Sequence, residues 1–240
     1  MLGIGSKLIG RKVIYLREVG STNDYARSIA AREDEGTVVV ADVQTRGRGR
    51  KGRSWVSSRG GLWMSVILKP RIPPSEVPKL VFVGALAVTD ALKAWGVEGR
   101  IKWPNDVLVN GKKVCGILSE ASFLEEVNHV VLGMGINVNN PAPEEGISLK
   151  DVLGREVPLP EFFRTLVEAL DLWYSVFLKD RARVLEEWRS RAILGTRVRV
   201  LGDEPFEGVA LDVDDDGCLL VDVGGRVTRI LYGDVSIRFN

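Results

Sequence analysis

Residues 75–95, SEVPKLVFVGALAVTDALKAW, are apolar nearly all round when placed on a helix. A helix without a polar face is stable only when other elements bury it, so this segment predicts a helix in the core of a domain. Residues 36–45 are rich in β-branched side chains and predict a buried strand, and residues 11–19 and 60–69 are also interpreted as strands. A core helix beside several strands predicts an α+β domain in which helices pack on a sheet.

The sequence between and after these segments alternates between helix and strand signals. Apolar residues at three- and four-residue spacing predict helices, and β-branched runs bounded by Gly, Pro or Asn predict strands. We expect a helix over 21–32, capped by Ser21 or Thr22, and amphipathic helices over 159–178 and 181–194. A strand should start at residue 100 and break at Pro104, and a hairpin up to residue 122 should turn at Asn110–Gly111. A further strand is expected over 126–140.

The character of the sequence changes after Gly195. About five short strand-like runs follow, separated by turns rich in glycine and aspartate, in fewer than fifty residues. This pattern predicts a small SH3-like β-barrel appended to the α+β domain. We therefore expect two domains, spanning residues 1–194 and 195–240.

Composition excludes several classes of protein. The chain has 240 residues and a net charge of +1, so it is not a generally basic protein that coats nucleic acid. The two cysteines, Cys115 and Cys218, do not form the framework of a small secreted domain, and no apolar run reaches the roughly 18 residues of a membrane span. We expect a cytoplasmic protein. The single histidine, His129, is interpreted as structural, and zinc sites built on paired histidines are excluded.

A cationic run, QTRGRGRKGRSWVSSRGG, interrupts this near-neutral sequence at residues 44–61. Five of the eight residues from Arg46 to Arg53 are cationic, and the nearest carboxylates are Asp42 and Glu76. Glycine lets backbone amides approach an anion closely, and arginine binds phosphate oxygens in bidentate fashion. The run approximates a P-loop, but arginine stands where that motif needs lysine, and a turn into a strand follows where a P-loop opens a helix.

Three interpretations compete for this run: a solvated loop, a nucleic-acid-binding module, and a site for nucleotide phosphate. The single sign of the charge and the interleaved glycines count against a merely solvated loop. Nucleic-acid binding needs a broader basic face, and the sequence contains no helix-turn-helix, zinc finger or recognisable RNA-binding signature. The pattern therefore favours a wrapped site for a nucleotide phosphate, with a nucleic-acid-binding module as the alternative from another class.

Four polar clusters stand beside strand ends in the same domain: STN (21–23), KWPND (102–106), GKKVCGILSE (111–120) and GMGINVNN (133–140). Each alone is explained as a helix cap, a turn, an exposed strand face or a strand-ending turn. Together with the cationic run, in this order and spacing, they resemble the biotin protein ligases (biotin–acetyl-CoA-carboxylase ligases). The motifs lie within residues 11–140, and the two-domain outline agrees over almost the whole chain.

The resemblance implies a fold and an activity. The fold is a mixed, largely antiparallel sheet with flanking helices, followed by an SH3-like domain. The activity is the formation of biotinyl-5′-AMP from biotin and ATP, followed by transfer of biotin to one lysine of a biotin carboxyl carrier protein. Mg²⁺ and positioned cations would neutralise the two reacting anions. A homodimer is also expected, and no nucleic-acid or membrane partner.

The resemblance also assigns roles to residues. Those expected to bind biotin are Ser21, Thr22, Asn23, Gln44, Gly47, Arg48, Lys113, Gly116, Leu118, Gly133 and Gly135. Those expected to bind ATP or the adenylate are Arg50, Arg53, Trp55, Asn105, Lys113 and Asn137. Lys113 is the expected essential cation between the biotin carboxylate and the phosphate, and Arg50, Arg53 and Asp106 complete the expected catalytic set. The glycine-rich loop should close over the intermediate. The resemblance does not assign the residues that bind the metal.

Two features depart from the family pattern. Bifunctional relatives carry an N-terminal DNA-binding module, whereas only about ten residues precede the first expected strand, so we expect a monofunctional enzyme without operator binding. Cys115 stands where alanine is common in the family, and related octanoyl transferases use a cysteine nucleophile. An acyl transferase therefore stays an alternative, although a small buried cysteine is the preferred interpretation. A lipoate-type ligase of the same fold is the main alternative within the class.

Overall fold

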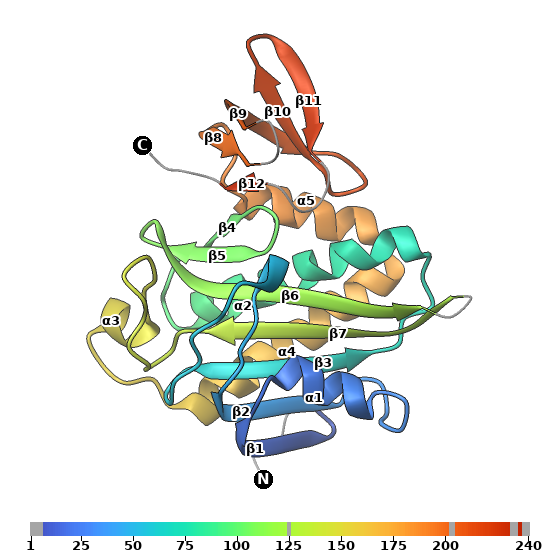
Figure 1. The fold of residues 1–240 in the computed structure, drawn as a ribbon, viewed down its shortest axis with the longest axis vertical. Coiled ribbons are helices and arrows are strands. Elements are labelled where there is room, and N and C mark those ends of the chain that lie inside the picture. Colours follow the sequence, from blue (N-terminus) through green and yellow to red (C-terminus); the bar gives the residue numbers. More distant parts are fainter. Residues whose placement is uncertain (1–6, 124–125, 202–204, 231–234, 237–240) are drawn as a thin grey trace.

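The computed structural model describes residues 7–123, 126–201, 205–230 and 235–236 (Figure 1). They form a seven-stranded sheet with the order β1-β2-β3-β7-β6-β5-β4 and a separate five-stranded sheet. The strands of the larger sheet are β1 (Val13–Val19), β2 (Val38–Gln44), β3 (Leu62–Leu68), β4 (Arg100–Lys102), β5 (Asp106–Val109), β6 (Lys112–Phe123) and β7 (Val127–Ile136). β1 and β2 run parallel and the other neighbouring pairs run antiparallel, which confirms the expected mixed, largely antiparallel sheet.

Helices cover the two faces of this sheet unequally. α2 (Leu80–Ala94) and α4 (Leu159–Lys179) pack against each other behind the sheet, and α1 (Thr22–Ile29) lies on the opposite face (Figure 1). Alternation along β7 separates the faces, because Leu132 belongs to the core with α2 and α4 whereas Val131 packs with α1. The remaining helical segments are the 3-10 turns η1 (Arg50–Gly52) and η2 (Pro74–Lys79), and the helices α3 (Leu149–Leu153) and α5 (Arg181–Arg191).

The predicted core helix is confirmed, although it begins later than expected. Every residue from Leu80 to Thr89 is buried in α2. The preceding turn, η2, contains Pro78, which has no N–H to donate to the regular helical ladder. Regular α-helical hydrogen bonding therefore starts only after this proline.

The helices expected over 21–32 and 181–194 end early, and one short helix was not predicted. The first of them ends at Ile29. The helix expected over 181–194 ends at Arg191, because the backbone of Ala192 is extended and Ile193 donates its N–H to the carbonyl of Ile101 in β4 (2.8 Å). Pairing with the sheet outweighs the local helical pattern there. The short helix α3 was not predicted, although Ser148 begins it with a capping box.

The hairpin prediction at residues 110–111 is confirmed. Asn110 and Gly111 have φ angles of 51° and 75°, the positive pair that a two-residue type I′ turn requires. The break at Pro104 is confirmed as well, with a cis peptide after Trp103. This turn pairs Lys102 at the end of β4 with Asp106 at the start of β5.

The C-terminal residues form the small all-β domain that was expected. Its strands, in the order β11-β10-β9-β8-β12, are β8 (Arg197–Val200), β9 (Phe206–Val213), β10 (Leu219–Val223), β11 (Arg226–Ile230) and β12 (Val235–Ser236). All neighbouring pairs are antiparallel. The turn between β9 and β10 touches the larger domain, since the indole N–H of Trp103 donates to the carbonyl of Gly217 (2.9 Å). Among the described residues no helix has the length and apolar character of a membrane span.

Candidate active site

Glycines form the floor of a large pocket on the sheet face that α1 leaves partly uncovered. Alternation along β7 places Leu132 and Ile136 in the core, so Gly133 and Gly135 face the other way. Strand pairing sets Gly135 beside Gly116 of β6. Because glycines carry no Cβ, the sheet leaves a pocket of about 1060 Å³ above them. A pocket of this size has room for a small acid and a nucleotide together.

A buried polar cluster forms one end of the pocket. The side-chain oxygen of Asn23 accepts a hydrogen bond from the Ser65 hydroxyl (2.6 Å). Thr22 donates both its backbone N–H and its hydroxyl to the carboxamide oxygen of Gln44 (2.8 and 3.0 Å). A Cβ at Gly133 would lie 2.0 Å from the Asn23 oxygen, so only glycine leaves room for this amide. The cluster presents fixed amides and hydroxyls, the groups that recognise a neutral polar ring.

Glu120 of β6 was not predicted as a site residue, and it ties the cationic loop to this cluster. Its carboxylate accepts a hydrogen bond from the Asn23 amide (2.8 Å) and forms an ion pair with Arg48 (3.1 Å). Arg48 also forms an ion pair with Asp24 of α1 (2.6 Å). Two carboxylates therefore hold the guanidinium of Arg48 against α1 and β6. These partners are distant in sequence from Arg48, so no local pattern indicates them.

The cationic loop folds back on itself beside the pocket. An isolated strand pair joins Gln44 to Ser57, and the N–H of Trp55 donates to the carbonyl of Gly47 (2.9 Å). A Cβ at Gly47 would lie 2.4 Å from the carbonyl oxygen of Trp55. Among the described residues that line the pocket Gly47 does not appear. Gly47 therefore permits the crossing of the loop and does not itself face the pocket.

Trp55 covers the middle of the glycine floor. A Cβ at Gly135 would lie 2.4 Å from the indole nitrogen, and a Cβ at Gly116 would lie 3.1 Å from the ring. The Lys113 ammonium lies 4.9 Å from the centre of the same ring, within cation–π range. A side chain at either glycine would displace the indole, so Trp55 and the floor form one packing unit.

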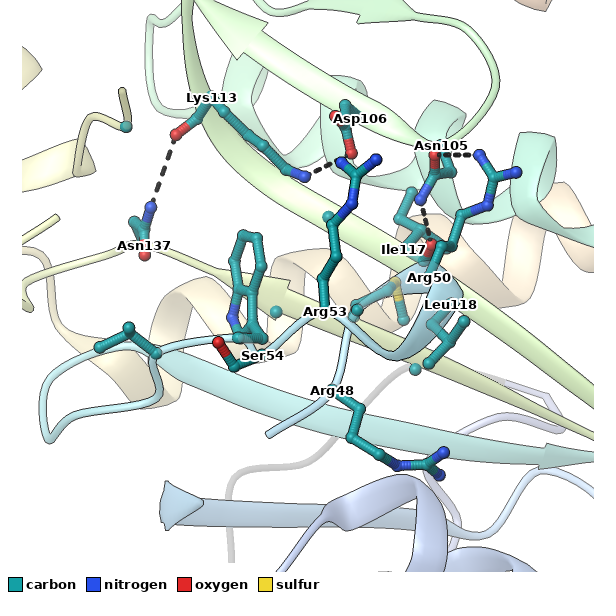
Figure 2. A pocket seen from close by; sticks show the side chains of 18 of the residues that line it. Arg48, Arg50, Arg53, Ser54, Asn105, Asp106, Lys113, Ile117, Leu118 and Asn137 are labelled. Atoms are coloured by element: carbon teal, nitrogen blue, oxygen red, sulfur yellow. Dashed lines mark hydrogen bonds and ion pairs between the residues drawn. The ribbon is translucent and has the colours of Figure 1, made fainter. Parts of the chain in front are cut away.

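Cations converge on the side of the pocket beyond Trp55. The Lys113 ammonium forms an ion pair with Asp106 (2.6 Å), and Figure 2 shows Arg53 extending from the loop toward this pair. Arg50 donates to the side-chain oxygen of Asn105 (3.1 Å), whose amide nitrogen is fixed by a carbonyl of β6 (2.7 Å). Arg48 points away from this group in the same view. The guanidinium groups of Arg50 and Arg53 and the ammonium of Lys113 therefore lie where they can bind a phosphate.

The structure brings the predicted residues together. Asn137, at the end of β7, is buried and accepts a hydrogen bond from the Asn140 amide (3.0 Å). Apart from Gly47, every predicted site residue lines the same pocket. The pocket also contains residues to which the sequence analysis gave no individual role, among them Lys102, Trp103 and Glu145. Lys102 and Trp103 lie in the KWPND motif, whereas no signal marks Glu145.

Cys115 does not have the surroundings of a nucleophile. Its side chain is fully buried in the core with the helices, and it is not among the pocket-lining residues in the described part of the chain. Burial raises the pKa of the thiol far above its ordinary value, which disfavours the reactive thiolate. A buried thiol outside the pocket cannot attack a substrate there, so this position of Cys115 argues against the acyl-transferase alternative. His129 is also buried, burial lowers its pKa, and it lies outside the pocket lining, in agreement with a structural role.

Comparisons with known proteins agree with this geometry. Residues 15–137 match the model of the biotin/lipoate A/B protein ligase family, and residues 193–238 match that of the biotin protein ligase C-terminal domain. The bifunctional ligase/repressor BirA of Bacillus subtilis is 36% identical over 98% of this chain and 77% of its own length. The biotin–[acetyl-CoA-carboxylase] ligase of Mycobacterium tuberculosis is 32% identical over 98% of this chain and 91% of its own.

A solved structure is similar throughout. The biotin protein ligase of Aquifex aeolicus in complex with biotin and ATP superposes with a TM-score of 0.85 and 31% identity, covering 96% of this chain and all of that one. Fold and pocket together define a protein built to activate an organic acid with a nucleotide. The chain belongs to the biotin/lipoate A/B protein ligase family. Both of its domains match the biotin protein ligase branch of that family.

Proposed function

We propose that this chain is a biotin protein ligase. It joins biotin to ATP to give biotinyl-5′-AMP and pyrophosphate, and then transfers biotin to a lysine of a biotin carboxyl carrier protein. The observation that carries the proposal is the continuity of the pocket. One pocket with a glycine floor is lined at one end by a buried amide and hydroxyl cluster and at the other by a group of cations that includes Lys113.

The neutral end of the pocket fits the ring of biotin. We assign ring recognition to Thr22, Asn23 and Gln44, whose amides and hydroxyls are already oriented by hydrogen bonds. Pre-oriented polar groups lower the entropy that binding costs. The remaining biotin contacts are assigned to Ser21, Arg48, Gly116, Leu118, Gly133 and Gly135, which line the same space.

The first step joins two anions. A carboxylate oxygen of biotin attacks the α-phosphorus of ATP, the bond from that phosphorus to the bridging oxygen breaks, and pyrophosphate leaves with the bonding electrons. The carboxylate is already ionised at neutral pH, so no general base is needed. We assign to Lys113, Arg50 and Arg53, which line the pocket, the neutralisation of the charge that repels the reactants and grows in the transition state.

The second step consumes the mixed anhydride. The amine of the carrier lysine attacks the acyl carbon, the bond to the phosphate oxygen breaks, AMP leaves, and the nitrogen loses a proton to form the amide. We assign Asn105 and Asn137 to the adenylate, and Trp55 to packing beside the adenine. Asp106 is assigned to the incoming amine, because its carboxylate lies in the pocket beside Lys113.

The pocket fits a magnesium ion that arrives with ATP. No cluster of three or more His, Cys, Asp or Glu side chains suited to a metal occurs among the described residues. Mg²⁺ is usually held by one or two carboxylates together with substrate phosphates, and Asp106 and Glu145 are the two carboxylates of the pocket lining. We assign the ion to these residues, where it would neutralise phosphate charge.

Further features of the proposal concern the whole protein. We propose a homodimer. The edge strand β1 supports it, because an edge strand can pair with a second chain and β1 exposes the large hydrophobic side chains of Val13 and Tyr15. We propose no nucleic-acid partner, because Arg48, Arg50, Lys51 and Arg53 of the loop line a pocket and do not form a broad basic face. A cytoplasmic location fits an ATP-consuming enzyme with two free cysteines. The domain boundary is proposed near residue 194, between α5 and β8.

Pyrophosphate release tests the proposal. The protein is incubated with ATP and Mg²⁺ and with biotin, lipoate or octanoate in separate reactions. Biotin should support pyrophosphate release, and the other two acids should not, because the amide and hydroxyl cluster matches a polar ring. Release with lipoate or octanoate but not with biotin would assign the pocket to the lipoate-type alternative.

A further inference from the structure

Lys102 is a pocket cation without an ionic partner. The half-buried cations that line the pocket are Arg50, Lys102 and Lys113. Arg50 donates to Asn105, and Lys113 pairs with Asp106. Within the part of the chain that the structure describes, the side chain of Lys102 forms no hydrogen bond and no ion pair within 4.0 Å. Partial burial of an ammonium costs free energy unless an anion compensates, so the position suits a residue that receives an anionic ligand.

The charges around Lys102 favour an incoming anion. Burial is the main cause that lowers the pKa of its ammonium, and the charges of Lys113 and Arg53 lower it further. Asp106 and Glu145 oppose this shift. Since the carboxylate of Asp106 is already paired with Lys113, it does not neutralise Lys102, and positive charge is in excess at this side of the pocket. A phosphate bound there would stabilise the ammonium form of Lys102.

Lys102 lies at the outer end of a row of residues that crosses the sheet. Strand pairing sets Gly135 of β7 beside Gly116 of β6, Gly116 beside Asp106 of β5, and Asp106 beside Lys102 of β4. Neighbouring strands lie about 4.8 Å apart, so Lys102 is about 14 Å from the glycine floor at β7. β4 is the edge strand of the sheet.

The order of groups along this row matches an in-line displacement. In such a reaction the attacking oxygen and the leaving oxygen lie on opposite sides of the phosphorus. The polar cluster that is proposed to receive the acid, with Asn23 and Ser65, lies over β3 and β7 at the centre of the sheet. The Lys113 ammonium lies beside Gly116 of β6 and pairs with Asp106 of β5, on the way from this cluster to β4. A carboxylate that attacks from the centre therefore drives the leaving group toward β4.

We infer that Lys102 binds the pyrophosphoryl group of ATP and holds it as it leaves. The inference rests on the proposed function, because it takes the acid to bind over the central strands. The two lysines then have separate roles, since Lys113 meets the reacting carboxylate and α-phosphate and Lys102 meets the β- and γ-phosphates. Lys102 should matter for adenylation and for its reversal by pyrophosphate, but not for transfer from a finished adenylate.

Two variants of Lys102 and one control variant test this assignment. Lys102→Met removes the charge at similar size, Lys102→Arg keeps it, and Lys93→Met removes a charge from the exposed surface of α2. Four quantities are measured: the KM for ATP, the inhibition constant of inorganic pyrophosphate, the KM for biotin, and the rate of transfer from added biotinyl-5′-AMP to a carrier domain. Lys102→Met should raise the first two by about tenfold, the loss of one charge-assisted hydrogen bond, with the transfer rate and the KM for biotin unchanged. Lys102→Arg should stay near the unmodified protein, and Lys93→Met should not differ from it.

The outcomes separate this inference from the proposed function. An unchanged pyrophosphate constant in Lys102→Met, or a loss confined to the transfer step, overturns the role of Lys102. Calorimetric titration of the unmodified protein and of Lys102→Met with pyrophosphate alone needs no organic acid. Another outcome is that pyrophosphate binds about tenfold more weakly to the variant even though biotin is not a substrate. That result would support Lys102 as an anion-binding residue and reject biotin as the acid.

Discussion

At the scale of single residues, the site depends on where side chains are missing as much as on where they are present. Gly133 leaves room for the amide of Asn23, and Gly116 and Gly135 leave room for the indole of Trp55. Side chains on β7 alternate between the two faces of the sheet, so Leu132, Met134 and Ile136 belong to the core while Gly133 and Gly135 face the pocket. Lys113 lies beside this floor, 4.9 Å from the centre of the indole ring and 2.6 Å from the carboxylate of Asp106. The glycines therefore leave room for the amide, the indole and the charged groups that we assign to the chemistry.

Lys113→Ala should cripple the adenylation step while the protein stays folded. Lys113 is the ammonium placed between the polar cluster and the loop, and removing a donor to a developing charge typically costs two to three orders of magnitude in rate, about 100-fold or more. The measurement is biotin-dependent pyrophosphate release, with circular dichroism to verify the fold. Lys93→Ala, on the exposed surface of α2, serves as the matched control. Near-normal release by the Lys113 variant would remove its proposed role.

Cys115→Ala should retain most of the ligase activity. The thiol lies in the helix-facing core and outside the pocket lining, so its loss removes packing and no reacting group. A small cavity of this kind is expected to lower the free energy of unfolding by about 1 kcal/mol. Steady-state kinetics together with thermal unfolding check both statements. A variant that folds normally but has lost all activity would restore the acyl-transferase alternative.

At the scale of elements, the turn between β4 and β5 links the pocket to the C-terminal domain. It carries Asn105 and Asp106 into the pocket, and the indole of Trp103 between the strands donates to the carbonyl of Gly217. Gly217 in turn lies against the ring of Phe82 in α2, where an added Cβ would come within 3.0 Å. The C-terminal domain therefore holds a turn that lines the pocket through a buried hydrogen bond.

Trp103→Phe should weaken the use of ATP without affecting the use of biotin. The substitution keeps an aromatic ring but removes the N–H that holds the turn, and a lost hydrogen bond of about 1 kcal/mol corresponds to about a fivefold change. We expect the KM for ATP to rise by that factor while the KM for biotin stays constant. Trp95→Phe is the matched control, because Trp95 packs on Phe162 and does not line the pocket in the described residues. Equal changes in both KM values would indicate general destabilisation instead.

Local patterns predicted most elements, whereas contacts between distant segments escaped them. The Asn110–Gly111 turn and the buried α2 follow from local sequence, because turn geometry and helix burial are local requirements. The end of α5 did not follow, since Ile193 leaves the helix to pair with β4. The pairing of Arg48 with Glu120 was likewise hidden, because it needs the loop, α1 and β6 in their final places. The resemblance to a family supplied the site residues that spacing alone left ambiguous.

At the scale of the whole molecule, the chain is nearly neutral and yet holds a strongly cationic pocket. The net charge is +1, while the pocket lining includes seven Lys or Arg residues and the two carboxylates Asp106 and Glu145. Positive charge is thus concentrated where anionic substrates react and balanced elsewhere. The scaffold that carries this pocket is also tied together at its N-terminal end. The buried carboxylate of Asp171 in α4 accepts hydrogen bonds from the backbone N–H groups of residues 7–9 (2.8–2.9 Å).

Asp171→Ala should destabilise the fold without a direct effect on the chemistry. It leaves three backbone N–H groups without their acceptor, and one of them belongs to the fully buried Ile9. The expected loss in the free energy of unfolding is about 3 kcal/mol. Urea denaturation measures it, and Glu161→Ala, an exposed carboxylate on the same helix, should cost less than about 1 kcal/mol. A stable Asp171 variant would show that the N-terminal segment contributes little to the fold.

Identifying the compound that the protein makes and retains tests directly whether it activates biotin. The protein is incubated with ATP, Mg²⁺ and equal amounts of biotin, lipoate and octanoate, separated from small molecules by gel filtration, denatured, and its released ligand is identified by mass spectrometry. The pocket described above predicts biotinyl-5′-AMP, held by the cationic loop and the amide cluster. Recovery of a lipoyl or octanoyl adenylate, or of unmodified ATP with no adenylate, would contradict the account.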